Sequence, residues 1–214
     1  MMRRTLALAT VTSFMLAGAA SSGFAAAPPD SMHATHDAKP AAATAAKPAA
    51  SEAAPDSSLR AMVLRRIADA QTKLISLAEA TPAEKYSWRP SAGVRTTGEV
   101  YMHVASANYF FPTFWGAKPP AGVDPRGFEK EGADKAKTVA TLKASFDYLQ
   151  QSIGALPDAE LGKAIQAFGH STTPAEMTLI AATHAHEHLG QAIAYARSTG
   201  VVPPWSAGQG QGGQ

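Results

Sequence analysis

Two histidines in the C-terminal third of the chain have a spacing that suits a metal ion. His184 and His188 lie four residues apart, so on a helix they share one face with about 5–6 Å between Cβ atoms, and both imidazoles can reach one cation. His186 stands two residues from His184, roughly 200° around the helix, and we expect it to point away. The pair predicts two ligands of a metal site.

A third histidine, His103, lies on the apolar stripe of an earlier helical segment, together with Val100 and Ala107. If the two segments pack together, His103, His184 and His188 converge on one point, and we predict them as the metal ligands. Buried histidines also hydrogen-bond to the backbone or to one another, so spacing alone leaves a structural role open. Three inward imidazoles without an obvious acidic partner carry a desolvation cost, however, and a shared cation removes it.

Three neutral imidazoles leave at least one coordination position for water or a substrate, as catalytic sites do. Water there could ionise near neutral pH, or the cation could hold a thiolate or polarise a carbonyl. Imidazole suits several divalent metals, and we expect zinc or nickel first, then iron or copper. Gln191, one turn beyond His188, is a candidate to hydrogen-bond a ligand or a substrate. The catalytic group itself stays unassigned.

Other chemistries are poorly represented. The chain has no cysteine, which excludes disulfides, thiolate zinc sites and a cysteine nucleophile. We find no carboxylate pair, Ser-His-Asp set or glycine-rich phosphate loop that competes for the catalytic role. Glu187 neighbours His188 but points roughly 100° away on a helix, so we interpret it as a solvated or interhelical charge.

Four amphipathic segments must position these side chains. Apolar residues recur every three or four positions in each, and Ser, Thr, Pro and Gly residues mark the ends. The expected helices are Leu59–Ala80, a second from the capping box at Thr96 to Gly116, a third through Val139 and Ile153 that stops at Gly154, and a fourth from Thr173 to Ser198.

This pattern predicts an all-α protein, a four-helix bundle over residues 57–205. Only 163–168 resembles a strand. The second helix carries Val100, His103, Ala107, Phe110 and Phe114 on the stripe that we expect to face inward. The 16-residue connection 117–132 is long for antiparallel neighbours, so the sequence leaves the helix order open.

The two ends of the chain differ from this domain. Residues 1–25 combine Arg3 and Arg4 with an apolar run that is too short and too polar to span a membrane, which predicts a cleaved signal peptide and a periplasmic or secreted protein without stable membrane insertion. Residues 26–56 hold 13 alanines and 5 prolines among 31 positions, which predicts a disordered linker. We expect the Gly/Gln-rich tail 206–214 to be disordered too.

The charge balance argues against nucleic acid as a partner. The chain has 19 Lys and Arg against 17 Asp and Glu, with a pI near 8.9. Loss of Arg3 and Arg4 with the signal peptide leaves 17 basic residues, equal to the acidic ones. An evenly charged domain lacks the basic patch that DNA, RNA or anionic lipid requires. A small-molecule substrate and a homodimer through an exposed helix face stay open.

Three segments carry a family resemblance: KYSWRPSAG, GEVYMHVASANYFF and THAHEHLGQAIAYARSTGVVPP. They resemble the DinB/YfiT-like family of small four-helix-bundle metalloenzymes, over roughly Leu59 to Pro204. In that family one histidine of the second helix and two histidines spaced by four on the fourth, followed by x-Gly-Gln, bind a divalent metal. His103, His184 and His188, with Gly190-Gln191 after the last, match these positions.

The resemblance implies two classes of function. The first is a metal-dependent hydrolase or transferase with a three-histidine site, and characterised relatives include transferases and isomerases that act with low-molecular-weight thiols. Such thiols are mainly cytosolic, so the expected export weakens the transferase interpretation. The second class is a noncatalytic metal-binding or stress-related envelope protein. An open coordination position favours the first, and a fourth protein ligand would favour the second.

Deletion of residues 26–56 should leave the melting temperature of the protein nearly unchanged, because this segment has almost no large side chain to bury. Thermal unfolding of the full chain and the deletion variant, followed by circular dichroism, measures this. A fall of many degrees would show that the segment packs on the bundle.

Overall fold

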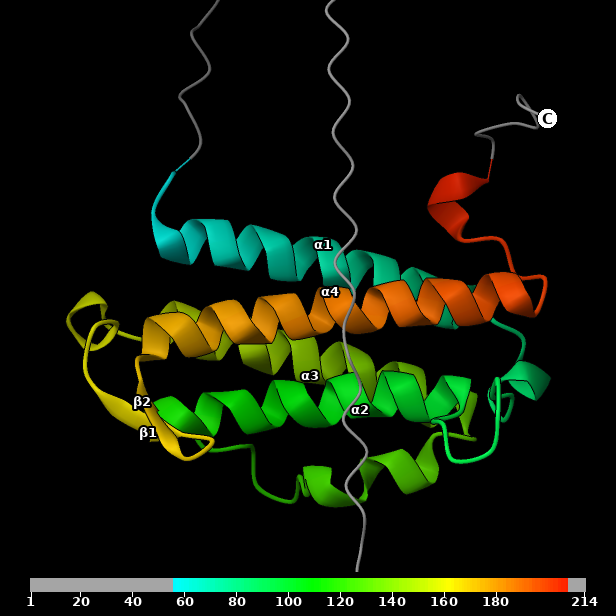
Figure 1. Ribbon diagram of the computed structural model, residues 1–214, viewed down its shortest axis with the longest axis horizontal. Coiled ribbons are helices and arrows are strands. Elements are labelled where there is room, and N and C mark those ends of the chain that lie inside the picture. The colour runs from blue at the N-terminus through cyan, green and yellow to red at the C-terminus, as the bar shows by residue number, and fades with distance from the viewer. Residues whose placement is uncertain (1–55, 208–214) are drawn as a thin grey trace, which may run out of the picture. The chain divides into compact units, whose positions relative to one another are not determined.

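The computed structural model describes residues 56–207. The predicted signal peptide, nearly all of the predicted linker and most of the predicted C-terminal tail lie outside these residues. Four long helices form a bundle (Figure 1), which confirms the predicted all-α class. They are α1 (Leu59–Ala80), α2 (Thr97–Phe110), α3 (Lys135–Ala155) and α4 (Pro174–Ser198).

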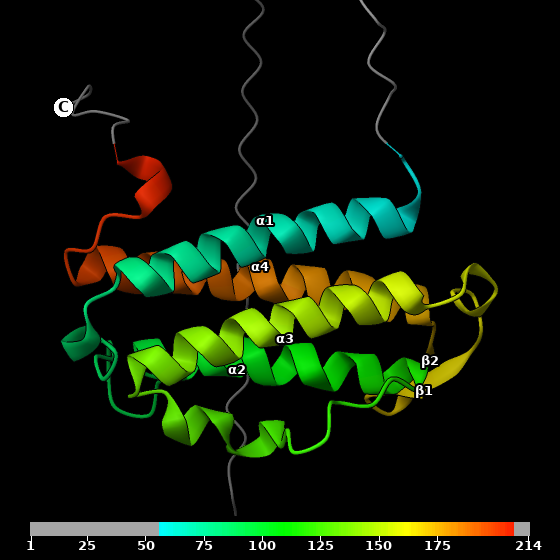
Figure 2. The ribbon, with the colours of Figure 1, turned by 180° about the vertical axis from the view of Figure 1, so that it is seen from behind.

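The order of the helices around the bundle is α1, α4, α2, α3. Helices that follow one another in sequence, α1 and α2, lie diagonally opposite, and so do α3 and α4. Figures 1 and 2 show that α1 runs parallel to its neighbour α4, that α2 runs parallel to α3, and that these two pairs run in opposite directions. The long connection 117–132 makes this possible, because it returns along α2 before α3 begins.

Local sequence signals set the helix starts. Thr96 accepts a hydrogen bond from the Glu99 N–H at 3.2 Å, and the Glu99 carboxylate accepts one from the Thr96 N–H at 2.6 Å, a complete capping box at the start of α2. The Thr173 hydroxyl caps α4 by accepting a hydrogen bond from the Glu176 N–H, and Pro174 lies in the first turn. The predicted bounds of α1 and α4 agree with the structure.

The prediction of one continuous second helix to Gly116 is wrong. Helix α2 ends at Phe110, and a 3-10 helix, η2 (Phe111–Trp115), continues the chain. Pro112 has no N–H to donate to the carbonyl four residues earlier, so the α-helical hydrogen bonds stop there. Gly116, with φ of 86°, then ends the segment in the left-handed conformation that glycine tolerates best.

The connection between α2 and α3 contains a further 3-10 helix, η3 (Pro125–Glu131), which packs along α2. Where it ends, the backbone of Gly132 approaches α2 closely at Gly98. A Cβ atom added at Gly98 would lie 1.7 Å from the Gly132 carbonyl oxygen. The missing side chain at Gly98 therefore lets η3 lie against α2, and η3 carries a carboxylate of the candidate site, as described below.

A short antiparallel hairpin connects α3 to α4. Strands β1 (Ile165–Ala167) and β2 (His170–Thr172) pair around a two-residue turn in which Phe168 has φ of 51° and Gly169 has φ of 83°. Two left-handed residues are the geometry of a type I′ turn. The strand predicted over 163–168 is therefore confirmed in part, and its partner strand was missed.

The core lies between the four helices. Its largest fully buried side chains come from every helix and include Ile67, Leu74 and Leu77 of α1, Tyr101 and Met102 of α2, Leu142, Phe146 and Leu149 of α3, and Met177 of α4. Burial of each such side chain stabilises the fold by about 1.5–3 kcal/mol. None of the helices within residues 56–207 combines the length and the apolarity that crossing a membrane requires.

Replacement of Gly98 by alanine should destabilise the protein by at least about 2 kcal/mol, because the new methyl group overlaps the Gly132 carbonyl and backbone must move. Gly154→Ala is the matched control, since a Cβ atom there meets nothing within 4 Å. It should leave the stability unchanged or raise it slightly, because alanine favours a helix over glycine. Urea unfolding of both variants tests the contact, and equal effects would contradict it.

Candidate metal centre

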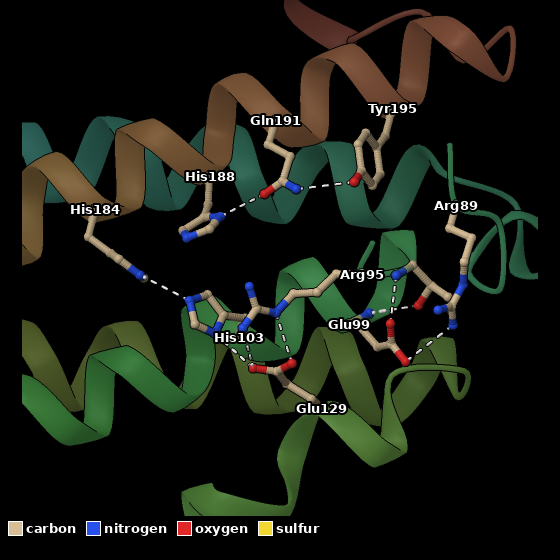
Figure 3. Close-up of polar contacts among 10 residues, drawn as sticks. Arg89, Arg95, Glu99, His103, Glu129, His184, His188, Gln191 and Tyr195 are labelled. Carbon is tan, nitrogen blue, oxygen red and sulfur yellow. Dashed lines mark hydrogen bonds and ion pairs between the residues drawn. The ribbon is translucent and has the colours of Figure 1, made fainter. Parts of the chain in front are cut away.

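The structure brings the three predicted histidines together. His103 lies on α2, and His184 and His188 lie one turn apart on the antiparallel neighbour α4 (Figure 3). One ring nitrogen from each can be chosen so that all three lie within 4.8 Å of one another. The Nε2 atoms of His103 and His184 are 3.3 Å apart. The expectation that helices two and four pack against each other is thereby met.

This spacing fits a shared cation. Two ligand nitrogens at 2.0–2.1 Å from a tetrahedral zinc ion lie about 3.3 Å from each other. No fourth histidine, cysteine or carboxylate ligand atom joins the three within residues 56–207. Three imidazoles are a donor set that would suit a borderline divalent metal, and a tetrahedral ion held by them would keep one further coordination position.

A carboxylate fixes the orientation of the His103 ring. His103 Nδ1 lies 2.8 Å from Glu129 Oε1, and because a carboxylate can only accept, Nδ1 carries the proton. The lone pair is then on Nε2, the nitrogen that faces His184. Glu129 also accepts hydrogen bonds from Arg95 Nε at 2.8 Å and from Arg95 Nη2 at 3.2 Å. Such a carboxylate is the usual outer partner of a metal-binding imidazole.

Gln191 plays the corresponding part for His188. Its Oε1 accepts a hydrogen bond from His188 Nδ1 at 2.8 Å, and its Nε2 donates to the Tyr195 hydroxyl at 3.1 Å. The amide is thereby fixed, and the free lone pair of His188 is on Nε2. The hydrogen bond to His188 agrees with one of the two roles predicted for Gln191, contact with a ligand histidine. Tyr195 in turn meets the edge of Trp88, with 5.3 Å between ring centres.

His184 has the most apolar surroundings of the three. Its ring meets the edge of Phe111 with 5.3 Å between centres, and its Nδ1 is buried without a hydrogen-bond partner. Burial, followed by the nearby His188, His103 and Arg95, lowers the pKa of His184 to about 3. The imidazole is therefore neutral at physiological pH, the state in which it can bind a metal.

The pKa values of His188 and of Glu129 are lowered as well. Burial is the main cause that lowers the pKa of His188, with the nearby His103 and Arg95 as smaller causes. Burial alone would raise the pKa of Glu129, but its hydrogen bonds from Arg95 and His103 outweigh burial and lower it. Two neutral imidazoles therefore lie beside an ionised, fully hydrogen-bonded carboxylate.

The prediction that the histidines belong to a buried stripe needs correction. All three are half-buried, and 25% of the His103 side chain is exposed. Phe110, placed on the same inward stripe, is 45% exposed and meets the edge of Phe114. Val100 and Ala107 of the predicted stripe are buried as expected, and the inward side of α2 also carries Tyr101, Val104 and Ala105. The stripe is rotated because η3 and α3 cover other sides of α2, so the histidines lie at the border of the core.

Two further predictions concern His186 and Glu187, which lie between His184 and His188 on α4. His186 lies away from the cluster, where its Nδ1 donates to the Ala182 carbonyl at 2.9 Å and its Nε2 lies 3.5 Å from Asp69. Its exclusion as a ligand is consistent with this place. Glu187 is exposed, as expected for a solvated charge.

A family model matches residues 66–192, which include all three histidines, and its description is DinB superfamily. The chain belongs to the DinB superfamily. No match was found among curated proteins. The suspected family is therefore confirmed, and with it the four-helix bundle.

Solved DinB-like structures share the fold at low identity. A DinB-like protein from Bacillus cereus is 15% identical with a TM-score of 0.58, covering 66% of this chain and 93% of that one. A DinB-like protein from Bacillus subtilis is 19% identical with a TM-score of 0.52 over the same shares. YfiT from Bacillus subtilis, described as a probable metal-dependent hydrolase with an unusual four-helix bundle topology, is 16% identical with a TM-score of 0.55, covering 73% and 95%.

Two residues of this DinB site were missed by sequence analysis. Glu129 lies in the connection 117–132, to which we assigned no site residue, and Arg95 directly precedes the helix cap at Thr96. The sequence interpretation therefore assumed histidines without an acidic partner, which is wrong for His103. The acidic residues of the connection 117–132 were candidates for such a partner, but no local pattern indicates which of them packs against α2.

The free energy of unfolding of the metal-free protein should fall as the pH is lowered from 6.5 to 5. The pKa of His184 is about 3 in the folded state, so in this window the unfolded chain binds more protons and stability rises with pH. One such group contributes a slope of up to about 1.4 kcal/mol per pH unit. Urea unfolding measures the slope, and His184→Asn should flatten it. An unchanged slope in that variant would refute the neutral, buried state.

Proposed function

We propose that this DinB-superfamily protein binds a divalent metal ion through His103, His184 and His188 and uses it to hydrolyse a small-molecule substrate. The observation that carries the proposal is the convergence of three imidazole nitrogens within 4.8 Å without a fourth protein ligand in residues 56–207. A structural metal site would be closed by a fourth ligand. The name of the structural neighbour YfiT, a probable metal-dependent hydrolase, supports the same class.

The protein's own residues prepare the site. Glu129 and Gln191 hold the protons of His103 and His188 on Nδ1, so that both Nε2 lone pairs face the shared point. Burial keeps His184 neutral. A divalent cation held by the three histidines would supply Lewis acidity toward a carbonyl or phosphoryl oxygen of the substrate. A quarter of the His103 side chain is exposed to solvent, which supports access of a small molecule to the cluster.

The other parts of the functional hypothesis rest on sequence. Export to the periplasm or secretion, zinc or nickel as the resident metal, and a homodimer are proposals of this kind. Signal-peptide cleavage in the native host, elemental analysis of the purified protein and its mass in solution test them one by one. Retention of the metal without any hydrolysis would favour the alternative, a noncatalytic metal-binding envelope protein.

Replacement of His188 by alanine should weaken zinc affinity by more than about 100-fold, because loss of a ligand costs more than loss of its outer hydrogen-bond partner, which costs about 10–100-fold. His186→Ala is the matched control, since His186 lies two residues away on the same helix but outside the cluster. It should bind zinc like wild type. Equal zinc affinity in all three proteins, measured by competition with a chromophoric chelator, would overturn the ligand assignment.

Activity is tested on the same three proteins. Zinc-loaded wild type and His186→Ala should hydrolyse an activated ester such as p-nitrophenyl acetate, and the metal-free protein and His188→Ala should not. Activated amides and phosphate esters extend the screen, with a low-molecular-weight thiol added in parallel to detect group transfer. Metal binding without a metal-dependent reaction on any of these substrates would contradict the hydrolase and leave the binding site standing.

A further inference from the structure

We infer that Arg95 determines the substrate class of this site: its guanidinium binds an oxyanion, a carboxylate or phosphoryl group, on the ligand that occupies the metal ion. The inference rests on the proposed function. It goes further because it assigns a specificity residue outside the three histidines and states the charge that the substrate must carry.

The charges around the three histidines do not balance once a divalent cation is bound. The three ligands are imidazoles, so they leave the charge of a divalent cation uncompensated. The carboxylate that contacts the cluster, Glu129, is matched by Arg95 through two hydrogen bonds of 2.8 and 3.2 Å. Glu187 is exposed to water, which screens its charge. A loaded site therefore has an excess of about two positive charges, and an anion is the ligand that best compensates them.

Arg95 has hydrogen-bond donors that the pair with Glu129 does not use. A guanidinium has five N–H donors, and only Nε and Nη2 donate to Glu129. Within residues 56–207 the Nη1 group has no hydrogen-bond partner, and 40% of the side chain is exposed. Its free donors can therefore reach a ligand without breaking the pair with Glu129.

The third argument is the place of the guanidinium. Figure 3 shows it beside the His103 ring and above the Glu129 carboxylate to which both side chains are joined. Arg95 and His103 share one carboxylate oxygen, because Glu129 Oε1 lies 3.2 Å from Arg95 Nη2 and 2.8 Å from His103 Nδ1. Arg89 provides the contrast. It pairs with Glu99 at 3.5 Å, is similarly exposed at 41%, and lies farther along toward the bundle end in Figure 3.

The chemistry of the two groups fits. A planar guanidinium presents parallel donors to the two oxygens of a carboxylate or phosphoryl group, and Glu129 holds this plane in a fixed orientation. An oxyanion on Nη1 would place the adjoining atoms of the substrate over the histidines. The competing explanation is that Arg95 only orients Glu129, in which case its loss would not discriminate between charged and neutral ligands.

The test uses the full chain loaded with Co²⁺, whose visible absorption reports ligand binding at the metal. Cobalt stoichiometry is measured first, and then acetate, inorganic phosphate and neutral imidazole are titrated into wild type, Arg95→Gln and Arg89→Gln. In Arg95→Gln the affinity for acetate, phosphate or both should fall about 10-fold or more, because a charge-assisted hydrogen bond is lost. Imidazole affinity should stay within about twofold of wild type. Arg89→Gln should match wild type throughout.

The double variant Arg95→Gln/Glu129→Gln separates direct contact from a change in net charge. It removes one charge of each sign, and the glutamine at 129 keeps an oxygen that can accept from His103 Nδ1. Weak anion binding in the double variant supports a direct contact, and the anion that loses more affinity distinguishes a carboxylate from a phosphoryl preference.

Three results would overturn the inference. Recovery of anion affinity in the double variant would show that only net charge matters. Equal losses for anions and imidazole would show that Arg95 merely positions the metal site. Unchanged anion affinity in Arg95→Gln would remove the contact altogether. In all three the cobalt site itself persists, whereas wild-type protein that binds no cobalt would overturn the proposed function and, with it, this inference.

Discussion

The site depends on holding three imidazoles at one point at the border of the core. Desolvation and mutual repulsion keep His184 and His188 neutral, so their nitrogens present lone pairs. Lone pairs that face one another are unfavourable without a proton or a cation between them. The 3.3 Å separation of the His103 and His184 Nε2 atoms fits both a shared proton and a shared metal ion. The rest of the bundle supplies the packing that maintains this arrangement.

Topology explains why a carboxylate reaches this point. Helices α2 and α3 run parallel, so the chain must return along α2 between them, and η3 is part of this return. Gly98 allows the end of η3 to contact α2 at the backbone. Glu129, one turn earlier, then reaches both His103 and Arg95. An antiparallel connection of a few residues would have left His103 without this partner.

The three histidines have hydrogen-bond partners of different charge. Glu129 gives His103 a negative outer partner, whereas Gln191 gives His188 a neutral one and is itself fixed by Tyr195. The buried Nδ1 of His184 has neither. Arg95 offsets the charge of Glu129, so this pair fixes the His103 ring without adding net charge beside the histidines.

The sequence by itself determined the parts of this protein that depend on neighbours along the chain. Helical periodicity and side-chain caps gave the bounds of α1 and α4, and the four-residue spacing placed His184 and His188 on one face, because one helical turn brings these residues together in any context. The apolar stripe of the second segment suggested His103 as their partner, the family resemblance matched the same residue, and the structure brings the three rings together.

Only the tertiary structure decided what depends on distant segments. The contact of His103 with His184 joins residues 81 positions apart, and that with Glu129 joins residues 26 apart across an irregular connection. The helix order and the exposure of Phe110 follow from the same packing. No periodic pattern encodes such contacts, because they form only where helices and connections settle against one another as the core closes.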